Sequence, residues 1–181
     1  AEGVTAFVDV GYHATELLIV AERQPLLYRS VRAGTARLAE AVGRALERSV
    51  AEAQSLVEDV VEITPEGREA PGDEGRVQRI AREEIDALLR EVGLLLHAHQ
   101  GQGGQAPDRV VLCGGLSRLE GAEDWASLRL GLPVKRASAD LEWGAAAPTG
   151  RARCGAQKAL SLALVPQARG RAIEVNFRKG D

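Results

Sequence analysis

Short runs of β-branched and aliphatic residues, separated by only a few polar ones, open the chain. The first run is residues 4–10 (VTAFVDV), which end at Gly11, and residues 16–20 and 26–31 form two more. Runs of this length and composition, bounded by polar turns, are typical of β-strands. Because a parallel return needs a crossover of about a dozen residues or more, these strands are predicted to form an antiparallel meander.

The spacing of hydrophobic residues then changes to the helical period. One long amphipathic helix is predicted to begin near Thr35, a suitable N-cap residue, and to continue to about Val60. Residues 64–75 are rich in Pro, Gly and acidic side chains and predict a loop, after which a second helix runs from Val77 to Leu96. We expect the stretch at 64–75 and the glycine-rich stretch at 101–107 to be flexible.

The pattern after residue 107 predicts a strand–helix–strand unit. The apolar residues within 109–113 (RVVLC) are consecutive, as expected of a buried strand. A short helix over about 120–130 and a short strand at 133–136 follow. Beyond them, residues 154–164 predict a helix rich in small side chains, and residues 173–177 predict a strand or an extended tail.

This order of elements predicts an α/β fold with one mixed sheet. Three antiparallel strands joined by hairpins come first, and parallel strands with flanking helices follow. The strand at 109–113 should pair in parallel with the first strand, because a helical crossover separates the two. We assign residues 1–165 to one lobe and residues 166–181 to a C-terminal extension.

The amino-acid composition and charge exclude several classes of protein. The 181 residues suit one domain with a small appendage, and the 3% of aromatic residues mean that the core is built from Leu, Val, Ala and Ile. The formal net charge is −3, whereas nucleic-acid-binding proteins are usually strongly basic, so we do not expect this chain to bind nucleic acid. No apolar run reaches the ~20 residues of a membrane span, and the start does not resemble a signal peptide. These two features lead us to expect a cytoplasmic chain, and since methionine is absent even at position 1, we expect it to be a piece of a longer protein.

Candidate metal ligands are few. Cys113 and Cys154 are expected to be free thiols, because two cysteines do not make a disulfide framework in a domain of this size. His97 and His99, at i and i+2, point to different faces of a helix, and no Cys or His pair has the spacing of a zinc site. We therefore expect no metal site.

The first candidate motif is Asp9-Val10-Gly11 followed by Thr15. A carboxylate at the tip of a strand can approach a phosphate-bound magnesium ion, and a glycine lets backbone N–H groups come close to phosphate oxygens. The Thr15 hydroxyl could add a further contact. The alternative is an ordinary hairpin, in which Asp and Gly serve the turn.

The second candidate motif is the double glycine Gly114-Gly115 after the buried strand. A planar ring can lie against such a backbone, and a helix that follows it would point its positive amino terminus towards the site. The alternative is a strand-to-helix turn that needs a positive φ.

Together, in this order and separated by two long helical segments, the motifs resemble those of the PilM, FtsA and GspL group of actin-like proteins. Residues 7–20 are similar to the second phosphate motif of that group, residues 110–134 to its adenosine motif, and residues 23–54 to the strand and helix between them. The resemblance covers roughly residues 4–165 and implies the ribonuclease-H-like half of an actin-like, two-lobed fold. The residues matching its nucleotide site are Asp9, Gly11, Thr15, Gly34, Gly114 and Gly115.

Two departures from the group argue against nucleotide binding. Members that bind ATP commonly have a double glycine where this chain has Ala33-Gly34, and a Lys after the segment that matches 51–53, where this chain has Gln54. The first phosphate motif, which belongs to the other lobe, is absent. We therefore expect no bound cofactor, although the match leaves ATP with magnesium as the rival interpretation, and we expect no catalysis by the chain alone.

The C-terminal segment favours the GspL type within this group. Residues 173–181 resemble the segment that closes a GspL cytoplasmic domain just before its membrane helix. The resemblance implies a non-catalytic scaffold of type II secretion on the cytoplasmic face of the inner membrane. It implies as partners a secretion ATPase (GspE-like), other platform proteins (GspM-like and GspF-like) and, as a further option, a second copy. The alternatives are a PilM-like pilus assembly protein and an actin-fold ATPase or kinase lobe.

Basic residues gather near the C-terminus. Lys and Arg are enriched on the cytoplasmic flanks of membrane helices, so we expect this end to face the lipid headgroups. The alternative is a solvated surface. The residues proposed to lie near the membrane are Arg169, Arg171, Arg178 and Lys179.

Overall fold

The computed structural model describes residues 3–22, 24–60 and 71–137. Several predictions therefore lie outside the described residues: the helix at 154–164, the tail at 173–177 and the domain boundary at 165. The same holds for the predictions made for Cys154, Arg169, Arg171, Arg178 and Lys179.

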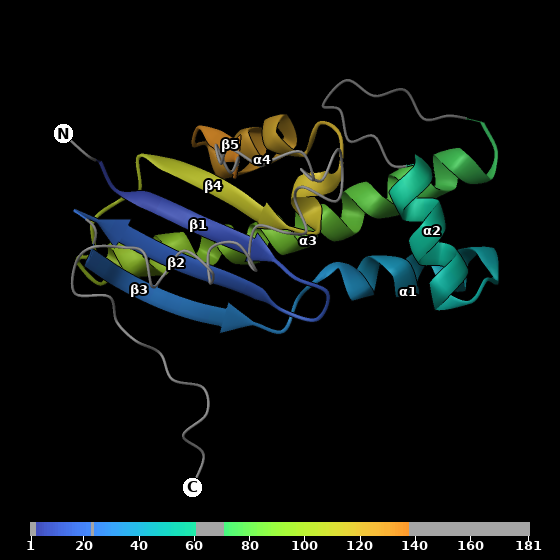
Figure 1. The fold of residues 1–181 in the computed structure, drawn as a ribbon, viewed down its shortest axis with the longest axis horizontal. Helices are drawn as coiled ribbons and strands as arrows, with labels where there is room; N and C mark the ends of the chain where they lie inside the picture. The colour runs from blue at the N-terminus through green and yellow to red at the C-terminus, as the bar shows by residue number, and fades with distance from the viewer. Residues whose placement is uncertain (1–2, 23, 61–70, 138–181) are drawn as a thin grey trace, which may run out of the picture. The chain divides into compact units, whose positions relative to one another are not determined.

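A five-stranded mixed sheet organises the described residues, with the strand order β3-β2-β1-β4-β5 (Figure 1). The first three strands pair antiparallel, β4 pairs in parallel with β1, and β5 pairs in parallel with β4. The predicted meander and the predicted parallel return are both confirmed. The strands are β1 (Thr5–Val10), β2 (Thr15–Ala21), β3 (Gln24–Val31), β4 (Arg109–Gly114) and β5 (Val134–Arg136).

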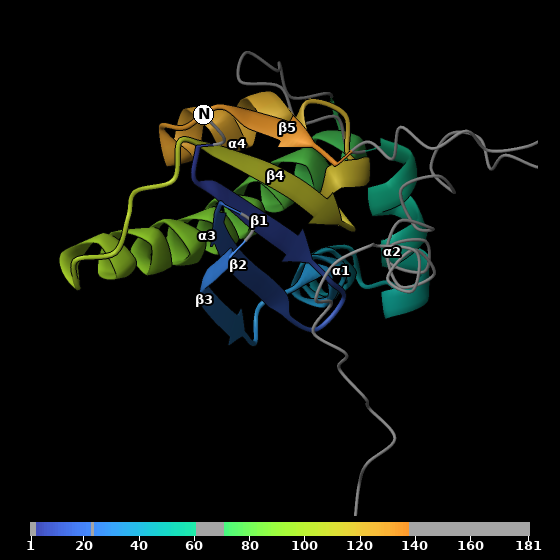
Figure 2. The same ribbon diagram turned by 60° about the vertical axis from the view of Figure 1, so that its left-hand side comes forward.

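Helices pack against one face of this sheet. Helix α3 runs along the back of the strands in Figure 1, whereas α2 lies away from the sheet and packs against α1 and α3 (Figures 1 and 2). Side chains alternate along β1 accordingly: Ala6, Val8 and Val10 are fully buried beneath the helices, and Phe7 on the other face is 36% exposed. The helices are α1 (Thr35–Leu46), α2 (Val50–Val60), α3 (Asp73–Gly101) and α4 (Ala122–Leu130), with a 3₁₀ turn at Leu116–Arg118.

Aliphatic side chains build the core, as the composition predicts. Leu17 and Ile19 from β2, Leu89 from α3 and Leu112 from β4 are all within 1% of complete burial. Trp125 on α4 joins them with only 7% of its surface exposed, so this tryptophan is a packing anchor of the core. Cys113 is half-buried, and its thiol lies 4.0 Å from the Val111 carbonyl oxygen, to which it donates.

The prediction of one helix from Thr35 to Val60 is wrong, because the chain breaks after Leu46. Glu47 adopts a left-handed conformation with φ of 53°, and its N–H bonds to the Gly43 carbonyl. A new helix, α2, begins at Val50. Thr35 is also not the N-cap of α1, since that position is Gly34 and Thr35 is the first helical residue.

The boundaries of two other elements need correction. Helix α3 begins at Asp73, so the end of the predicted loop at 64–75 is helical, and the N-cap is Gly72. The double glycine Gly114-Gly115 leads into a single 3₁₀ turn rather than a helix, and α4 begins only at Ala122. No α-helix amino terminus therefore follows the double glycine directly.

Ser49 and Glu52 form a reciprocal capping box at the start of α2. The Ser49 N–H and hydroxyl both donate to Glu52 Oε2, at 3.0 and 2.7 Å, and the Glu52 N–H donates to Ser49 Oγ at 3.3 Å. The side-chain hydrogen bond from Ser49, followed by the one from its backbone, holds the pKa of Glu52 below its ordinary value.

Ser49→Ala is expected to raise the pKa of Glu52 towards its ordinary value, because the strongest donor to the charged carboxylate is lost. In the wild type, the contribution of this contact is complete above the ordinary glutamate pKa and is lost as the pH falls through the lowered one. An NMR titration of the Glu52 side-chain carboxyl carbon in both proteins measures the shift. An unchanged Glu52 pKa in the variant contradicts the capping box.

Candidate functional site

The two motifs singled out in the sequence meet at the carboxyl ends of β1 and β4. Asp9 lies opposite Cys113 and Val10 opposite Gly114 in the parallel ladder, and the Gly115 N–H donates to the Val10 carbonyl at 2.6 Å. Ligands of open α/β sheets commonly bind at such strand ends. The structure therefore brings Asp9 together with the double glycine.

Gly114 is required by both its conformation and its neighbours. Its φ is +75°, which side-chain-bearing residues rarely adopt, and a Cβ built on it would collide with the Val10 carbonyl and the Asp9 carboxylate. The Asp9 carboxylate thus rests against the Gly114 backbone. The positive-φ turn that was the alternative interpretation of this motif is present.

Asp9 is half-buried on the sheet face that does not carry the buried β1 core residues. It lies opposite Glu16 in the antiparallel β1–β2 pair, so two carboxylates occupy a cross-strand position. Among residues 3–22, 24–60 and 71–137 no cluster of three or more potential metal ligands occurs.

The hairpin after Asp9 begins with Gly11, whose N–H donates to the Ala14 carbonyl at 2.9 Å. Its tip carries side chains, since Tyr12 is 41% exposed and packs edge-on against His13 with ring centroids 4.6 Å apart. A hairpin that cradles phosphate with backbone N–H groups favours glycine, because a phosphate must come close to the backbone. Here Gly11 alone offers that access.

Thr15 is buried, at 1% exposure, and its hydroxyl donates to the Ala33 carbonyl at 2.6 Å. The hydroxyl that the sequence offered to a phosphate is thus directed to the loop between β3 and α1. Its observed contact is structural, because it ties the first residue of β2 to the approach to α1.

Gly34 allows the start of α1 to pack directly onto the hairpin. The Thr35 N–H donates to the Gly11 carbonyl at 3.0 Å and the Ala36 N–H to the Tyr12 carbonyl at 2.8 Å. A Cβ on Gly34 would lie 2.6 Å from the Gly11 carbonyl oxygen. The first N–H groups of α1, which could otherwise bind an anion, are therefore used by the hairpin.

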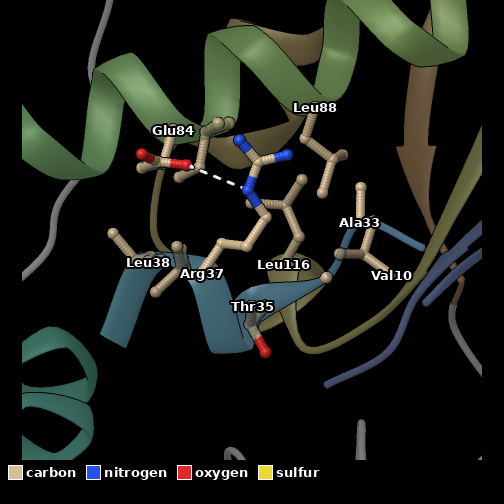
Figure 3. Close-up of a pocket in the computed structure, with 11 residues that line it drawn as sticks. Val10, Ala33, Thr35, Arg37, Leu38, Glu84, Leu88 and Leu116 are labelled. Carbon is tan, nitrogen blue, oxygen red and sulfur yellow. Dashed lines mark ion pairs between the residues drawn. The ribbon is translucent and has the colours of Figure 1, made fainter. Parts of the chain in front are cut away.

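A narrow pocket lies between α1, α3 and the turn after β4 (Figure 3). Its volume of about 20 Å³ is far below the ~300–1,000 Å³ of small-molecule sites. The Arg37 side chain reaches across it to Glu84, at 3.6 Å, and also lies 3.8 Å from Glu91, whereas Thr35 points away from that pair in Figure 3. Most of its lining is aliphatic: Val10, Ala33, Leu38, Ile85, Leu88, Leu116 and Leu119.

Arg37 and Glu84 did not stand out in the sequence. They lie on different helices, α1 and α3, and no motif or spacing links them. Only the packing of the two helices could reveal the pair.

Within the described part of the chain, no helix is both long and apolar enough to cross a bilayer.

Comparisons with known proteins identify the fold. No protein-family profile matches the chain, and no curated protein matches it at a significant level. Solved structures do match. The PilM–PilN type IV pilus biogenesis complex matches with a TM-score of 0.63 and 20% sequence identity, over 76% of this chain and 36% of the other.

Two further structures have the same arrangement of elements. MreB5 of Spiroplasma citri, bound to AMPPNP, matches with a TM-score of 0.61 and 14% identity, over 76% of this chain and 49% of that protein. Ta0583, an archaeal actin homolog, matches with a TM-score of 0.56 and 16% identity, over 76% of this chain and 43% of that protein. The chain thus spans less than half the length of each of these three proteins. Its described residues have the mixed α/β fold of the actin-like proteins.

Proposed function

We propose that this chain is part of a non-catalytic scaffold that links a cytoplasmic assembly ATPase to inner-membrane platform proteins, as in type II secretion. The observation that supports it most directly is the internal use of the groups matched to the phosphate site. The Thr15 hydroxyl bonds to Ala33, and the first N–H groups of α1 bond to the hairpin. A lobe built in this way has the actin-like fold, and the polar groups that match the phosphate site stabilise that fold.

A PilM-like role in pilus assembly is the second form of the same proposal. The likeness to PilM, whose structure was solved in a complex with PilN, supports a protein that works by binding other proteins. The two forms differ in the segment that each requires beyond residue 181. A GspL-like chain needs a membrane span of about 20 apolar residues there, and a PilM-like chain does not.

Cross-linking of the full-length protein in its native cells tests the scaffold role. The expected partners are a secretion or pilus ATPase and single-span inner-membrane proteins, identified by the positions of their cross-links. Cross-links to neither class of protein contradict the proposal.

An actin-fold ATPase or kinase is the rival function, and one observation favours it. The Asp9 carboxylate lies against Gly114, as a magnesium ligand next to an adenine platform would. We nevertheless expect no ATP hydrolysis and no stabilisation of the full-length protein by magnesium-ATP. A ligand at 100 times its Kd adds about 2.7 kcal/mol to the unfolding free energy, so a thermal-shift titration is decisive. Stabilisation that disappears in Asp9→Ala establishes nucleotide binding and overturns the expectation of no bound nucleotide, whereas measurable ATP hydrolysis overturns the non-catalytic scaffold.

The basic C-terminal residues give the membrane-facing part of the proposal its own test. The 181-residue chain is expected to bind anionic vesicles at low salt and to dissociate at high salt, since each Lys or Arg near an anionic surface adds about 1 kcal/mol. Replacing Arg169, Arg171, Arg178 and Lys179 together by glutamine should abolish co-sedimentation and leave the melting temperature nearly unchanged. Equal binding by the variant shows that these charges form an ordinary solvated surface.

A further inference from the structure

Strand β3 is an edge strand of the described sheet. It pairs with β2 on one side, and no other described strand pairs with its outer side. Its side chains are open to solvent: Tyr28 is 57% exposed and Leu26 is 40% exposed. A sheet edge of this kind presents a row of backbone N–H and C=O groups that can pair with a further strand.

Only the first part of this edge carries the features that usually prevent pairing. Pro25 lacks an N–H, and the pairing of β2 with β3 shifts register between Ile19 and Val20, as at a β-bulge. From Leu27 to Val31 the register with β2 is unbroken. About five residues of regular strand, a usual length for one partner in a ladder, therefore remain.

A partner strand paired with β3 would meet different side chains on the two faces of the sheet. Leu27 and Val31 pack against the core, so the face that they share with Arg29 is the helix-bearing one. On the opposite face, Tyr28 lies opposite Leu18, and Leu18 lies opposite Phe7, which forms an apolar row across three strands. An added strand would continue this row with an apolar side chain.

The charge of the edge favours one kind of occupant. Between Gln24 and Ala33 the chain carries Arg29 and Arg32 and no acidic residue, and neither arginine is buried. If two copies paired antiparallel about Tyr28, each Arg29 would lie diagonally opposite its counterpart, within reach of these long side chains, so that the two like charges would repel each other. A strand that brings carboxylates to the helix-bearing side and apolar groups to the other side has complementary charge.

We propose that the β3 edge, from Leu27 to Val31, is a docking site for an extended acidic segment of a partner protein, which adds to the sheet as a further strand. Backbone pairing along the edge provides the affinity, and Arg29 and Arg32 select carboxylates. The proposal deepens the scaffold role proposed above, on which it rests for naming a protein as the occupant. The docking surface that it proposes is separate from the site formed by Asp9 and Gly114.

An NMR titration of the full 181-residue chain with synthetic peptides tests this docking site. The probe is a short peptide of alternating valine and glutamate, and the control has lysine in place of glutamate. The acidic peptide is expected to bind at least tenfold more tightly than the basic one and to slow amide hydrogen exchange within β3. Binding is expected to weaken at least tenfold in Arg29→Glu and to stay within twofold of wild type in Arg90→Glu, which changes an exposed arginine on α3.

Peptides N-methylated on alternate residues separate strand pairing from simple charge attraction. In a β-ladder every second N–H of an edge partner points at the neighbouring strand. Of two peptides methylated on the odd or the even residues, one should lose binding and the other should keep it. Equal binding by both, equal weakening by Arg29→Glu and Arg90→Glu, or resonance shifts outside β2 and β3 overturn the proposal.

Self-association of the chain through β3, detected by sedimentation, also overturns it, since a second copy would then be the occupant. Failure of the peptide to bind removes this docking site and leaves the scaffold role to be decided by the cross-linked partners. A nucleotide-binding result, in turn, does not affect the peptide measurements.

Discussion

The Gly34→Ala variant is expected to lose about 3 kcal/mol of unfolding free energy, the upper end of the usual range for over-packing, and to melt roughly 6–12 °C lower. The added methyl group would meet the Gly11 carbonyl oxygen at 2.6 Å and the Tyr12 backbone at a similar separation. These are backbone atoms held by hydrogen bonds to Thr35 and Ala36, so the hairpin cannot move without breaking the contacts that start α1. Urea unfolding followed by circular dichroism measures the loss.

Gly115→Ala is the matched control for this change. Its backbone is ordinary right-handed, with φ of −61°, and a Cβ there would meet the Thr35 methyl group at 3.2 Å, a side chain that can adjust by a few tenths of an ångström. The control is therefore expected to cost less than about 1 kcal/mol. Equal losses in the two variants would show that Gly34 has no special role at the junction of the hairpin and α1.

The sheet could be predicted from the sequence because its strands have distinct local patterns. The short intervals between the runs at 4–10, 16–20 and 26–31 leave space only for hairpins. The consecutive apolar residues within 109–113 indicated a further strand, but Val111 and Cys113 are half-buried, so this strand is not fully covered on both faces as expected. Once these are placed, the parallel pairing of β4 with β1 follows from the helical crossover. That pairing also accounts for the meeting of Asp9 and Gly114, since adjacent parallel strands end at the same edge.

The break in the first helical segment could not be predicted from hydrophobic period alone. Leu46, Val50 and Ala53 continue the helical spacing through the break, although Glu47 leaves the helix. The local signal was the capping box, because Ser49 stands three residues before Glu52. A Ser-x-x-Glu inside a long periodic segment therefore indicates a new helix start.

The observed contacts of Thr15 and Gly34 depend on neighbours that are distant in sequence. A threonine after a strand offers a hydroxyl, but its partner, the Ala33 carbonyl, is brought close only by the β2–β3 hairpin. Gly34 likewise meets Gly11 only after α1 has packed onto the sheet. Residue type predicted which groups are polar at this site, and tertiary packing decided which of them bond to one another.

Helix α4 is held to α3 by Trp125. Its indole N–H donates to Asp86 Oδ1 at 2.8 Å, and the Arg129 guanidinium makes two further bonds to the same carboxylate, at 2.8 and 2.7 Å. The guanidinium also stacks 4.7 Å from the Trp125 ring centroid. One aromatic side chain thus joins an apolar contact with the core to a polar network between the two helices.

Trp125→Ala is expected to cost about 3–5 kcal/mol of unfolding free energy, the usual range for truncation of a buried aromatic residue, which corresponds to a fall of roughly 6–20 °C in Tm. Only 7% of the Trp125 surface is exposed, so the variant leaves a cavity between α3 and α4. Trp125→Phe keeps an aromatic ring in the core and loses the N–H, while Asp86 keeps both bonds to Arg129. It is therefore expected to cost only about 1–2 kcal/mol. Urea unfolding followed by far-ultraviolet circular dichroism compares the two variants, and a loss below about 1 kcal/mol in Trp125→Ala would contradict the role of Trp125 as the anchor of α4.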